Sequence, residues 1–335
     1  MPLISFSTKI LNNLPCEVSH FIALKSLKIL NFLGLLKFLD LVKESKCKNS
    51  KSQNIFNLSN KLGIAAGLDK NGDYIDCLAA LGIGFIELGT VTPRPQSGNS
   101  KPRLFRIKKD KALVNRLGFN NKGVDYFVSR LKEKKSNVII GSSIGKNFDT
   151  PNHRAYEDYL LCLEKVYQYT DYIAVNISSP NTKDLRELTH SDYLTDLIGK
   201  LKSKQQELSN LHGYKPIFLK ISPDEDFINL KKICNSIIEN KIDGVICSNT
   251  SINHNYFGGQ GGLSGAPLRH TSTACLREVK RIVGDTIPII ASGGVMTVSD
   301  FEEKLEAGAD FVQLYTGFIY EGPKLIKDIV DHCTK

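Results

Sequence analysis

From residue 61 onward, short apolar runs rich in Ile, Val and Phe alternate with longer stretches whose apolar residues recur at helical spacing. Runs that are apolar throughout are typical of parallel strands buried on both faces of a sheet. Eight such strands are predicted, at residues 62–66, 84–88, 138–143, 172–177, 216–221, 244–247, 287–291 and 311–315. Helices are predicted between most of them, at 156–167, 193–208, 227–239, 273–283, 298–307 and 323–331. Eight units in about 270 residues favour an α/β fold, the (β/α)8 TIM barrel, over an open doubly wound sheet.

The first 60 residues follow a different pattern, in which Lys residues are interspersed with Leu, Ile and Phe at helical spacing. This predicts two or three amphipathic helices, with breaks at Leu14-Pro15 and at Gly34. The longest uncharged stretch of the later part, 29–36, is far shorter than the ~20 residues of a membrane-spanning helix. Such helices can lie in a membrane interface or pack as a cap on the main domain. The polar stretch 43–54 predicts a linker, so we expect a helical segment at 1–50 and a catalytic barrel at 55–335.

Composition and charge indicate a globular protein and exclude several other classes of protein. Hydrophobic residues make up 41% of the chain and charged residues 24%, which is typical of a globular protein and not of a disordered or collagen-like one. The net charge is +9, and the first 60 residues hold eight Lys against three acidic residues. Such a run usually forms a solvated face, but on apolar helices it also suits an anionic membrane surface. The eight Cys contain no C-x-x-C pair, which argues against a zinc site, an iron–sulfur cluster or a disulfide framework.

In a barrel of this type, binding and catalytic residues lie in the loops after the carboxyl ends of the strands. The predicted strand ends are followed by Lys70 and Lys220, by several Asn and hydroxyl side chains, and by glycines such as Gly293, Gly294 and Gly317. Asn amides donate and accept hydrogen bonds, which suits a planar heterocycle, and the two Lys suit anionic ligands. Glycine amides after the last strands suit a phosphate. Each feature alone is ordinary turn chemistry, but their coincidence at nearly every strand end favours a binding site.

Other cofactor sites lack their sequence signatures. Asp69 is the only acidic residue in these loops and His is absent from them, so no metal site is expected. No G-x-G-x-x-G motif follows an early strand and no Walker A motif occurs, which argues against a dinucleotide-binding fold and a P-loop enzyme.

Six segments, in order along the chain, carry a resemblance to a known family. They are LGIAAGLDKNG at 62–72, GTVTPRP at 89–95, NRLGFNN at 115–121, NISSPN at 176–181, GGLSGAP at 261–267 and VQLYTG at 312–317. Together they resemble dihydroorotate dehydrogenase over about residues 55–330. The basic, apolar N-terminal helices extend the likeness to class 2 of that family, which is membrane-associated and uses a quinone. Ser179 agrees with this class, because class 1 members carry Cys in the same loop.

The resemblance implies a site for flavin mononucleotide (FMN), a substrate site and a quinone pocket. The residues implied for FMN are Ala66, Gly67, Lys70, Thr90, Ser143, Asn176, Lys220, Ser248, Gly265, Gly294, Tyr315 and Thr316. Those implied for the substrate are Lys70, Asn115, Arg116, Leu117, Gly118, Phe119, Asn176, Asn181, Asn249 and Thr250. Those implied for the quinone are His20, Arg106 and Tyr315. Ser143 and Ser248 depart from the family, in which Asn and Thr are common there, and the shorter Ser143 alters one flavin contact.

The implied reaction is the oxidation of (S)-dihydroorotate to orotate in de novo pyrimidine biosynthesis. Ser179 is implied as the base that takes the proton from C5, with Thr182 and Phe119 at a water-mediated relay. FMN accepts the hydride from C6, Lys220 stabilises charge on the reduced flavin, and a membrane quinone is the final oxidant. We therefore expect a monomeric peripheral membrane protein on the cytoplasmic side of the bacterial inner membrane, which binds an anionic membrane surface and no nucleic acid.

Three alternatives remain at this point. One is a flavin barrel that reduces a base in tRNA, an enzyme type that needs a catalytic Cys and a basic C-terminal extension, whereas the excess charge of this chain lies at its N-terminus. Another is a class 1 dihydroorotate dehydrogenase, which Ser179 disfavours. The third is a membrane adaptor without catalytic activity, which would bind no chromophore.

Overall fold

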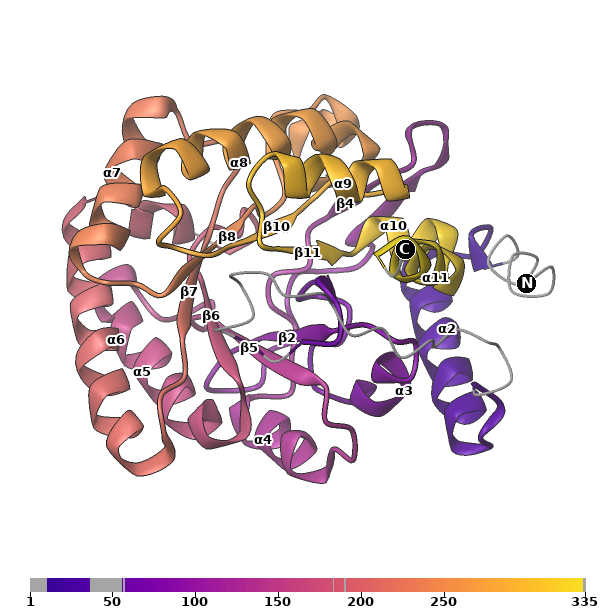
Figure 1. Ribbon diagram of the computed structural model, residues 1–335, viewed down its shortest axis with the longest axis horizontal. Helices are drawn as coiled ribbons and strands as arrows, with labels where there is room; N and C mark the ends of the chain where they lie inside the picture. Colours follow the sequence, from indigo (N-terminus) through magenta and orange to yellow (C-terminus); the bar gives the residue numbers. More distant parts are fainter. Residues whose placement is uncertain (1–10, 37–55, 57, 183, 190, 334–335) are drawn as a thin grey trace.

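The computed structural model describes residues 11–36, 56, 58–182, 184–189 and 191–333, and at its centre lies a closed barrel of parallel strands (Figure 1). Around the barrel the strand order is β1-β11-β10-β8-β7-β6-β5-β2. The barrel strands are β1 (Leu62–Ile64), β2 (Phe85–Val91), β5 (Ile139–Ile144), β6 (Tyr172–Asn176), β7 (Ile217–Ile221), β8 (Gly244–Cys247), β10 (Ile289–Ser292) and β11 (Phe311–Leu314). Each coincides with one of the eight predicted runs, so the predicted (β/α)8 barrel is confirmed.

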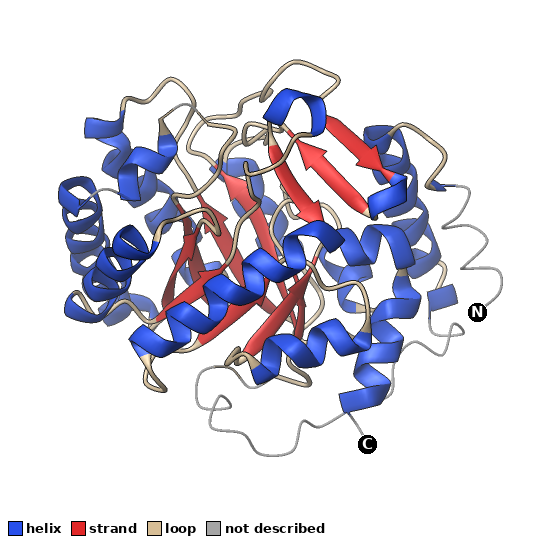
Figure 2. Ribbon diagram, turned by 90° about the horizontal axis from the view of Figure 1, so that it is seen from above, coloured by secondary structure: helices blue, strands red, loops and turns tan. Residues whose placement is uncertain are grey.

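Helices cover the outside of the barrel, as Figures 1 and 2 show. They are α3 (Ile75–Ala79), α4 (Val124–Glu133), α5 (Ala155–Val166), α6 (Ser191–His212), α7 (Phe227–Glu239), α8 (Arg269–Val283), α9 (Val298–Glu306), α10 (Thr316–Glu321) and α11 (Pro323–Cys333). All six predicted helices are present, and α6 and α8 are longer than predicted. The helices α3, α4 and α10 were not predicted. Because α3 and α10 have only five and six residues, they are too short to show a helical period.

A second, smaller sheet was also not predicted. It consists of the antiparallel strands β3 (Leu104–Ile107), β4 (Ala112–Asn115) and β9 (Gly262–Gly265), and it lies apart from the barrel in Figure 2. The strand β4 comes from the long insertion between β2 and β5, and β9 from the segment after β8. Their register places Asn115 opposite Gly262. The small sheet thus brings two distant loops of the chain together beside the carboxyl ends of the barrel strands.

The amino end of the barrel is closed by an aromatic cluster. Phe56 packs against Tyr172, Phe218 and Phe311, with ring centroids 5.3 to 6.0 Å apart. Small residues leave room for these rings, since a Cβ added to Gly141 would lie 2.0 Å from the Tyr172 ring. Among the described residues, this end of the barrel is therefore filled by packed side chains.

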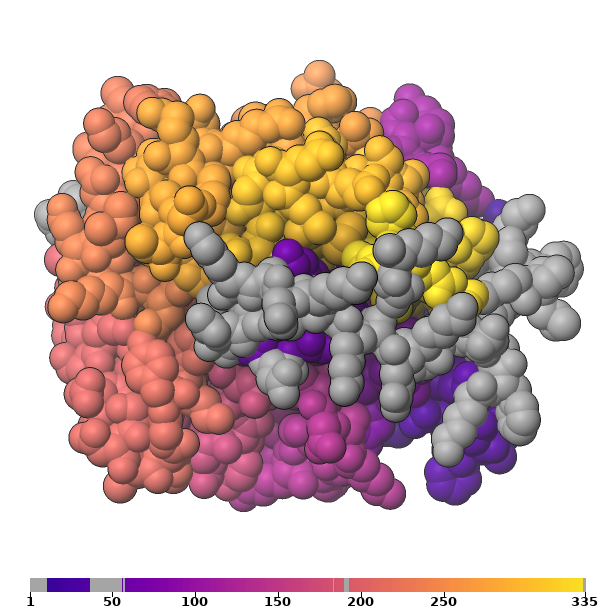
Figure 3. Space-filling view, in the orientation of Figure 1, coloured from indigo at the N-terminus to yellow at the C-terminus, as the bar shows by residue number. Residues whose placement is uncertain are grey.

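The N-terminal helix α2 (Cys16–Phe32) begins after Pro15 and ends before Gly34, where φ is +71°. Both predicted breaks are therefore confirmed. In Figures 1 and 3, α2 lies at the same end of the molecule as α10 and α11. Its buried side chains are Cys16, Ser19, Leu24 and Leu27. The predicted linker 43–54 and the rest of the predicted N-terminal segment, at 1–10 and 37–50, lie outside the described residues, and no described helix is long and apolar enough to span a membrane.

Candidate active site

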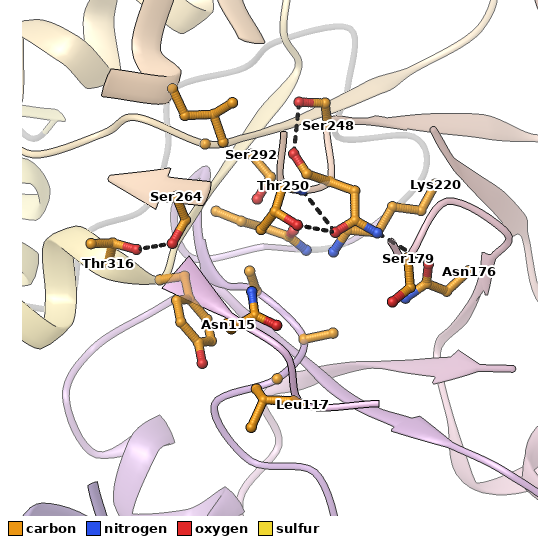
Figure 4. Close-up of a pocket in the computed structure, with 18 of the residues that line it drawn as sticks. Asn115, Leu117, Asn176, Ser179, Lys220, Ser248, Thr250, Ser264, Ser292 and Thr316 are labelled. Carbon is orange, nitrogen blue, oxygen red and sulfur yellow. Dashed lines mark hydrogen bonds between the residues drawn. The ribbon is translucent and has the colours of Figure 1, made fainter. Parts of the chain in front are cut away.

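A cavity of about 940 Å³, including its open mouth, lies at the carboxyl ends of the barrel strands (Figure 4). Every residue implied for the flavin or the substrate lines it, apart from Ser143 and Arg116. Ser179 and Phe119 also lie in its wall. Further lining residues that the sequence did not single out for a ligand are Ala65, Ser264, Leu268, Ser292, Val295 and Gln313.

Asparagine side chains on several strand ends form a hydrogen-bonded set in the cavity wall. Asn176, the last residue of β6, donates from Nδ2 to Thr90 Oγ1 at 2.9 Å, and its Oδ1 accepts from Asn249 Nδ2 at 3.2 Å. In the small sheet, Asn115 Oδ1 accepts from Asn181 Nδ2 at 2.8 Å. These bonds fix which atoms of each amide face the cavity. The wall therefore presents oriented donors and acceptors, as a planar heterocycle requires.

Ser179 lies in the loop after β6, buried in the cavity wall. Its Oγ accepts a hydrogen bond from the Asn181 N–H at 3.3 Å. The nearby Thr182 hydroxyl is buried and has no hydrogen-bond partner within the described part of the chain. Phe119 lines the same cavity with a φ of +51°. A buried hydroxyl usually has a partner, so Thr182 Oγ is the natural contact for a water or a ligand atom.

Beneath this wall, a buried carboxylate pairs with Lys220. Lys220 Nζ donates to Glu87 Oε1 at 3.1 Å, and Gln313 Nε2 donates to Glu87 Oε2 at 2.8 Å. Glu87 is fully buried, and the Gln313 side-chain oxygen has no partner among the described residues. Glu87 was not predicted from the sequence, because it lies inside a strand and the prediction considered only strand ends. The signal that could have found it is an acidic residue inside an otherwise apolar strand.

Lys70 enters the cavity from the loop after β1. Burial, followed by the nearby Arg103, lowers the pKa of Lys70 to about 7, and Nζ donates to Asn120 Oδ1. The preceding Asp69 shapes this loop, because its carboxylate accepts the backbone N–H of Tyr74 at 2.7 Å and of Asp73 at 3.0 Å. Lys70 thus presents an amine near its titration point to the cavity.

Glycines form the other end of the cavity, which we call the glycine end (Gly265, Gly293 and Gly294). All three have positive φ, and a Cβ on Gly294 would lie 2.2 Å from Arg269 Cα. Beside them, Thr316 Oγ1 and Ser264 Oγ are 2.8 Å apart, as Figure 4 shows. Close packing against the rest of the chain requires glycine at these positions. Because the three glycines also line the cavity, their backbone can contact an anionic group there.

Two implied residues lie outside the cavity wall. Ser143 is fully buried behind Thr90, with the two hydroxyl oxygens 2.8 Å apart. The Arg116 guanidinium lies 5.0 Å from the centre of the Phe105 ring, and Nη1 donates to Gln260 Oε1 at 2.6 Å. Ser143 therefore contacts Thr90, which lines the cavity, and does not line the cavity itself.

A second cavity of about 1450 Å³, including its open mouth, lies between α2 and the main body and has a mainly aliphatic lining. His20 and Arg106 both line it. Arg106 donates to the carbonyl oxygens of Asn12 and Leu14 and to Ser19 Oγ, at 3.0 to 3.1 Å, which ties the start of α2 to β3. Burial lowers the pKa of His20 to about 4, so this side chain is neutral near pH 7.

Tyr315, the third residue implied for the quinone, does not line the second cavity. It lines the first cavity together with Gly67, and both also line a third cavity of about 1320 Å³ that contains His20 and Lys70. Tyr315 therefore lies in the wall of both the first and the third cavity.

The family model for dihydroorotate dehydrogenase matches residues 50–335. The chain belongs to this family. It is 47% identical to the dihydroorotate dehydrogenase (quinone) of Vibrio atlanticus over 325 residues, which cover 95% of this chain and 96% of the relative. It is 53% identical to that of Shewanella sediminis over 279 residues, which cover 81% and 82%.

Solved structures of the family agree with the fold. The ligand-free dihydroorotate dehydrogenase of Eimeria tenella aligns with a TM-score of 0.82 at 34% identity, covering 92% of each chain. A ferulenol complex of the enzyme from the same organism aligns with a TM-score of 0.81 at 32% identity, covering 94% of this chain and 89% of the other. The chain thus belongs to the quinone-using class of dihydroorotate dehydrogenases and is an oxidoreductase. The alternatives of a tRNA base reductase, a class 1 enzyme and a membrane adaptor are set aside.

Proposed function

We propose that the protein oxidises (S)-dihydroorotate to orotate in the first cavity, with FMN as the bound cofactor and a membrane quinone as the final oxidant, in de novo pyrimidine biosynthesis. The observation that carries this proposal is the wall of that cavity, which brings together oriented Asn amides, Ser179, Lys220 and the glycine end. In a member of the dihydroorotate dehydrogenase family, this wall is suited to a planar substrate beside a phosphorylated cofactor.

The residues present fit FMN. The glycine end and the Thr316 hydroxyl line the cavity and suit the phosphate, because backbone N–H groups at glycines after the last strands of such a barrel commonly bind phosphate. Lys220 and the Gln313 side-chain oxygen, which no described residue contacts by a hydrogen bond, suit the polar edge of the flavin ring. Thr90 and Asn176 complete that part of the wall. When bound, FMN supplies a two-electron acceptor, which no protein side chain provides. The protein contributes position and charge.

For the substrate, Ser179 is the proposed base at C5 of dihydroorotate. A free serine hydroxyl is a weak base, so it needs a route by which the proton can leave. The buried Thr182 hydroxyl, which has no partner among the described residues, supports a relay through an ordered water beside Phe119. Asn115, Asn176, Asn181 and Asn249 orient the substrate ring through their amides, and Lys70 attracts the substrate carboxylate. Arg116 does not line the first cavity, and its guanidinium is turned toward Phe105.

For the quinone, the second cavity is the proposed entrance, with His20 and Arg106 as its polar contacts and Tyr315 between it and the flavin. The exposed apolar face of α2 supports docking at a membrane surface, because Ile29, Phe32 and Leu33 are each more than half exposed. The N-terminal segment 1–50 would then be the membrane and quinone module, and 55–335 the catalytic barrel. The proposed location is the cytoplasmic side of the bacterial inner membrane, as a monomeric peripheral protein.

The absorbance spectrum of the purified protein tests the proposal. Flavin bands near ~370 and ~450 nm should be present and should bleach when dihydroorotate is added without air, because the flavin carries the redox change. A decylubiquinone-type acceptor should then restore the bands. A colourless protein, or a flavin that dihydroorotate does not bleach, would contradict the proposed cofactor or the proposed substrate, respectively.

A further inference from the structure

A buried lysine lies directly behind the glycine end of the first cavity. Lys304, on α9, is fully buried. Its Nζ donates to Ser272 Oγ and to Thr273 Oγ1, both at 2.7 Å, and is 3.4 Å from the Arg269 carbonyl oxygen. All three partners are neutral groups of the first turn of α8. The ammonium is well hydrogen-bonded, but none of these contacts is to a carboxylate, and Glu303 and Asp300 attract it only without direct contact.

The carboxylates of Asp300 and Glu303, next to Lys304 on α9, form ion pairs with Arg269 and not with Lys304. Asp300 Oδ1 lies 2.8 Å from Arg269 Nη1, and Glu303 Oε2 lies 2.6 Å from Arg269 Nε. No ion pair among the described residues includes Lys304. Burial lowers the pKa of Lys304 to about 8, which still leaves the amine mostly protonated at pH 7. A buried charge without a counter-charge is costly, and natural proteins rarely keep one without a use.

One hydroxyl separates this charge from the cavity. Ser272 Oγ, which accepts from Lys304, lies 3.0 Å from the carbonyl oxygen of Gly293. Gly293 and Gly294 line the cavity, and a Cβ on Gly293 would lie 3.3 Å from Ser272 Cβ. The path from the ammonium to the cavity wall therefore runs through a single side chain. An anion held by the glycine end would therefore lie close behind this side chain and would add a counter-charge to Lys304.

We infer that Lys304 is a positioning residue for the cofactor phosphate: its charge, acting from behind Ser272 and Gly293, is compensated by the phosphate monoester of FMN. The inference rests on the proposed function, since it takes FMN as the occupant of the first cavity. Charges interact strongly through a buried, water-poor region, so the effect does not require direct contact. It follows that Lys304 destabilises the protein without FMN and stabilises the complex with it.

The test compares FMN with riboflavin, which lacks the phosphate, on the full-length protein stripped of flavin. In Lys304→Met the Kd for FMN should rise on the order of tenfold or more, while the Kd for riboflavin should stay within about twofold of wild type. Inorganic phosphate should compete with FMN more weakly in the variant than in wild type. The melting temperature of the stripped variant should equal or exceed that of the stripped wild type, because an uncompensated buried charge has been removed.

Two further variants serve as controls. The first separates the charge of Lys304 from its hydrogen bonds, and the second separates it from the net charge of the protein. Lys304→Gln keeps a donor for the Ser272 and Thr273 hydroxyls but not the charge, so it should lose FMN affinity as Lys304→Met does. Lys280→Met, in which the lost lysine pairs with Asp285 near the other end of α8, changes the net charge equally and should leave both Kd values unchanged. Equal losses for FMN and riboflavin, or wild-type FMN affinity in Lys304→Gln, would overturn the inference. If wild type bound no FMN at all, the proposed function would fail instead.

Discussion

Ser179 is the residue on which the proposed chemistry depends most directly. Its hydroxyl is buried in the cavity wall and accepts only the Asn181 N–H among the hydrogen bonds of the described residues. In Ser179→Ala, orotate should still bind, because the Asn amides remain, but flavin reduction in single turnover should slow by about 10²–10⁴-fold, the usual worth of a positioned base.

Stopped-flow bleaching by dihydroorotate measures this rate. Ser179→Cys should keep part of the activity, with its pH profile moved toward the titration of a thiol. Bleaching at the wild-type rate in Ser179→Ala would remove Ser179 from the role of base.

The pKa of Lys70 predicts that orotate binding takes up a proton. With a pKa of about 7 in the free protein, Lys70 is about nine-tenths neutral at pH 8. A bound orotate carboxylate favours the charged amine and raises this pKa, so binding at pH 8 should take up nearly one proton, and affinity should fall as pH rises through 7. Calorimetric titrations in buffers of different ionisation enthalpy measure the uptake. Heats that do not depend on the buffer would contradict the prediction, and Lys70→Met should abolish the dependence.

The strand-end residues could be predicted from the sequence because a barrel gathers the ends of all its strands at one opening. Glu87 and Lys304 could not be found in this way. Glu87 lies inside a strand, and Lys304 lies inside a helix, where a lysine usually faces solvent. Only the packing of α9 on α8 shows that Lys304 is buried. The turn of Arg116 toward Phe105 likewise depends on a contact that the sequence does not specify.

At the scale of elements, the barrel depends on glycines that leave room for the aromatic cluster. Gly141 is in β5, and an added Cβ would lie 2.0 Å from the Tyr172 ring. Gly141→Ala should therefore lower the free energy of unfolding by about 1–3 kcal/mol through overpacking. Gly199→Ala is the matched control, since Gly199 lies on α6 with nothing within 4 Å of the added Cβ, and it should stabilise by up to about 1 kcal/mol.

Urea unfolding of both variants measures the difference. The prediction is contradicted if Gly141→Ala unfolds at the same midpoint as wild type, which would mean that the ring at Tyr172 moves aside freely.

The barrel strands were predictable because each is buried on both faces and so appears as a continuous apolar run. The small sheet was not predictable on this basis. Its strands have four residues each, and β4 pairs with β9 across about 150 residues of chain. A strand as short as Gly262–Gly265, with two glycines, is defined by its partner more than by its own composition.

At the scale of the whole molecule, α2 gives one end of the protein an exposed apolar face. Ile29 and Phe32 lie on neighbouring turns, are 58% and 89% exposed and line none of the cavities described above. Replacing both with Asp should weaken binding to vesicles of mixed anionic and neutral lipid by about tenfold or more. The variant loses two apolar side chains that would insert into the lipid, and it gains two negative charges that anionic lipid repels. Flavin bleaching by dihydroorotate should stay as in wild type.

Leu211→Asp is the control, because Leu211 is 71% exposed but lies on α6. It should leave vesicle sedimentation unchanged. Equal sedimentation of the α2 double variant and wild type would contradict membrane docking through this face.

The separation of the first and second cavities has a kinetic consequence. Among the described residues none lines both, and Tyr315 lies in the wall of the first. An electron donor and an electron acceptor that occupy such spaces never need to be present together. Double-reciprocal plots against dihydroorotate at several quinone concentrations should therefore be parallel. A compound that fills the second cavity should compete with the quinone. It should leave the reduction of the flavin by dihydroorotate unchanged. An inhibitor that is selective among related enzymes can therefore be directed at this cavity and need not resemble the pyrimidine.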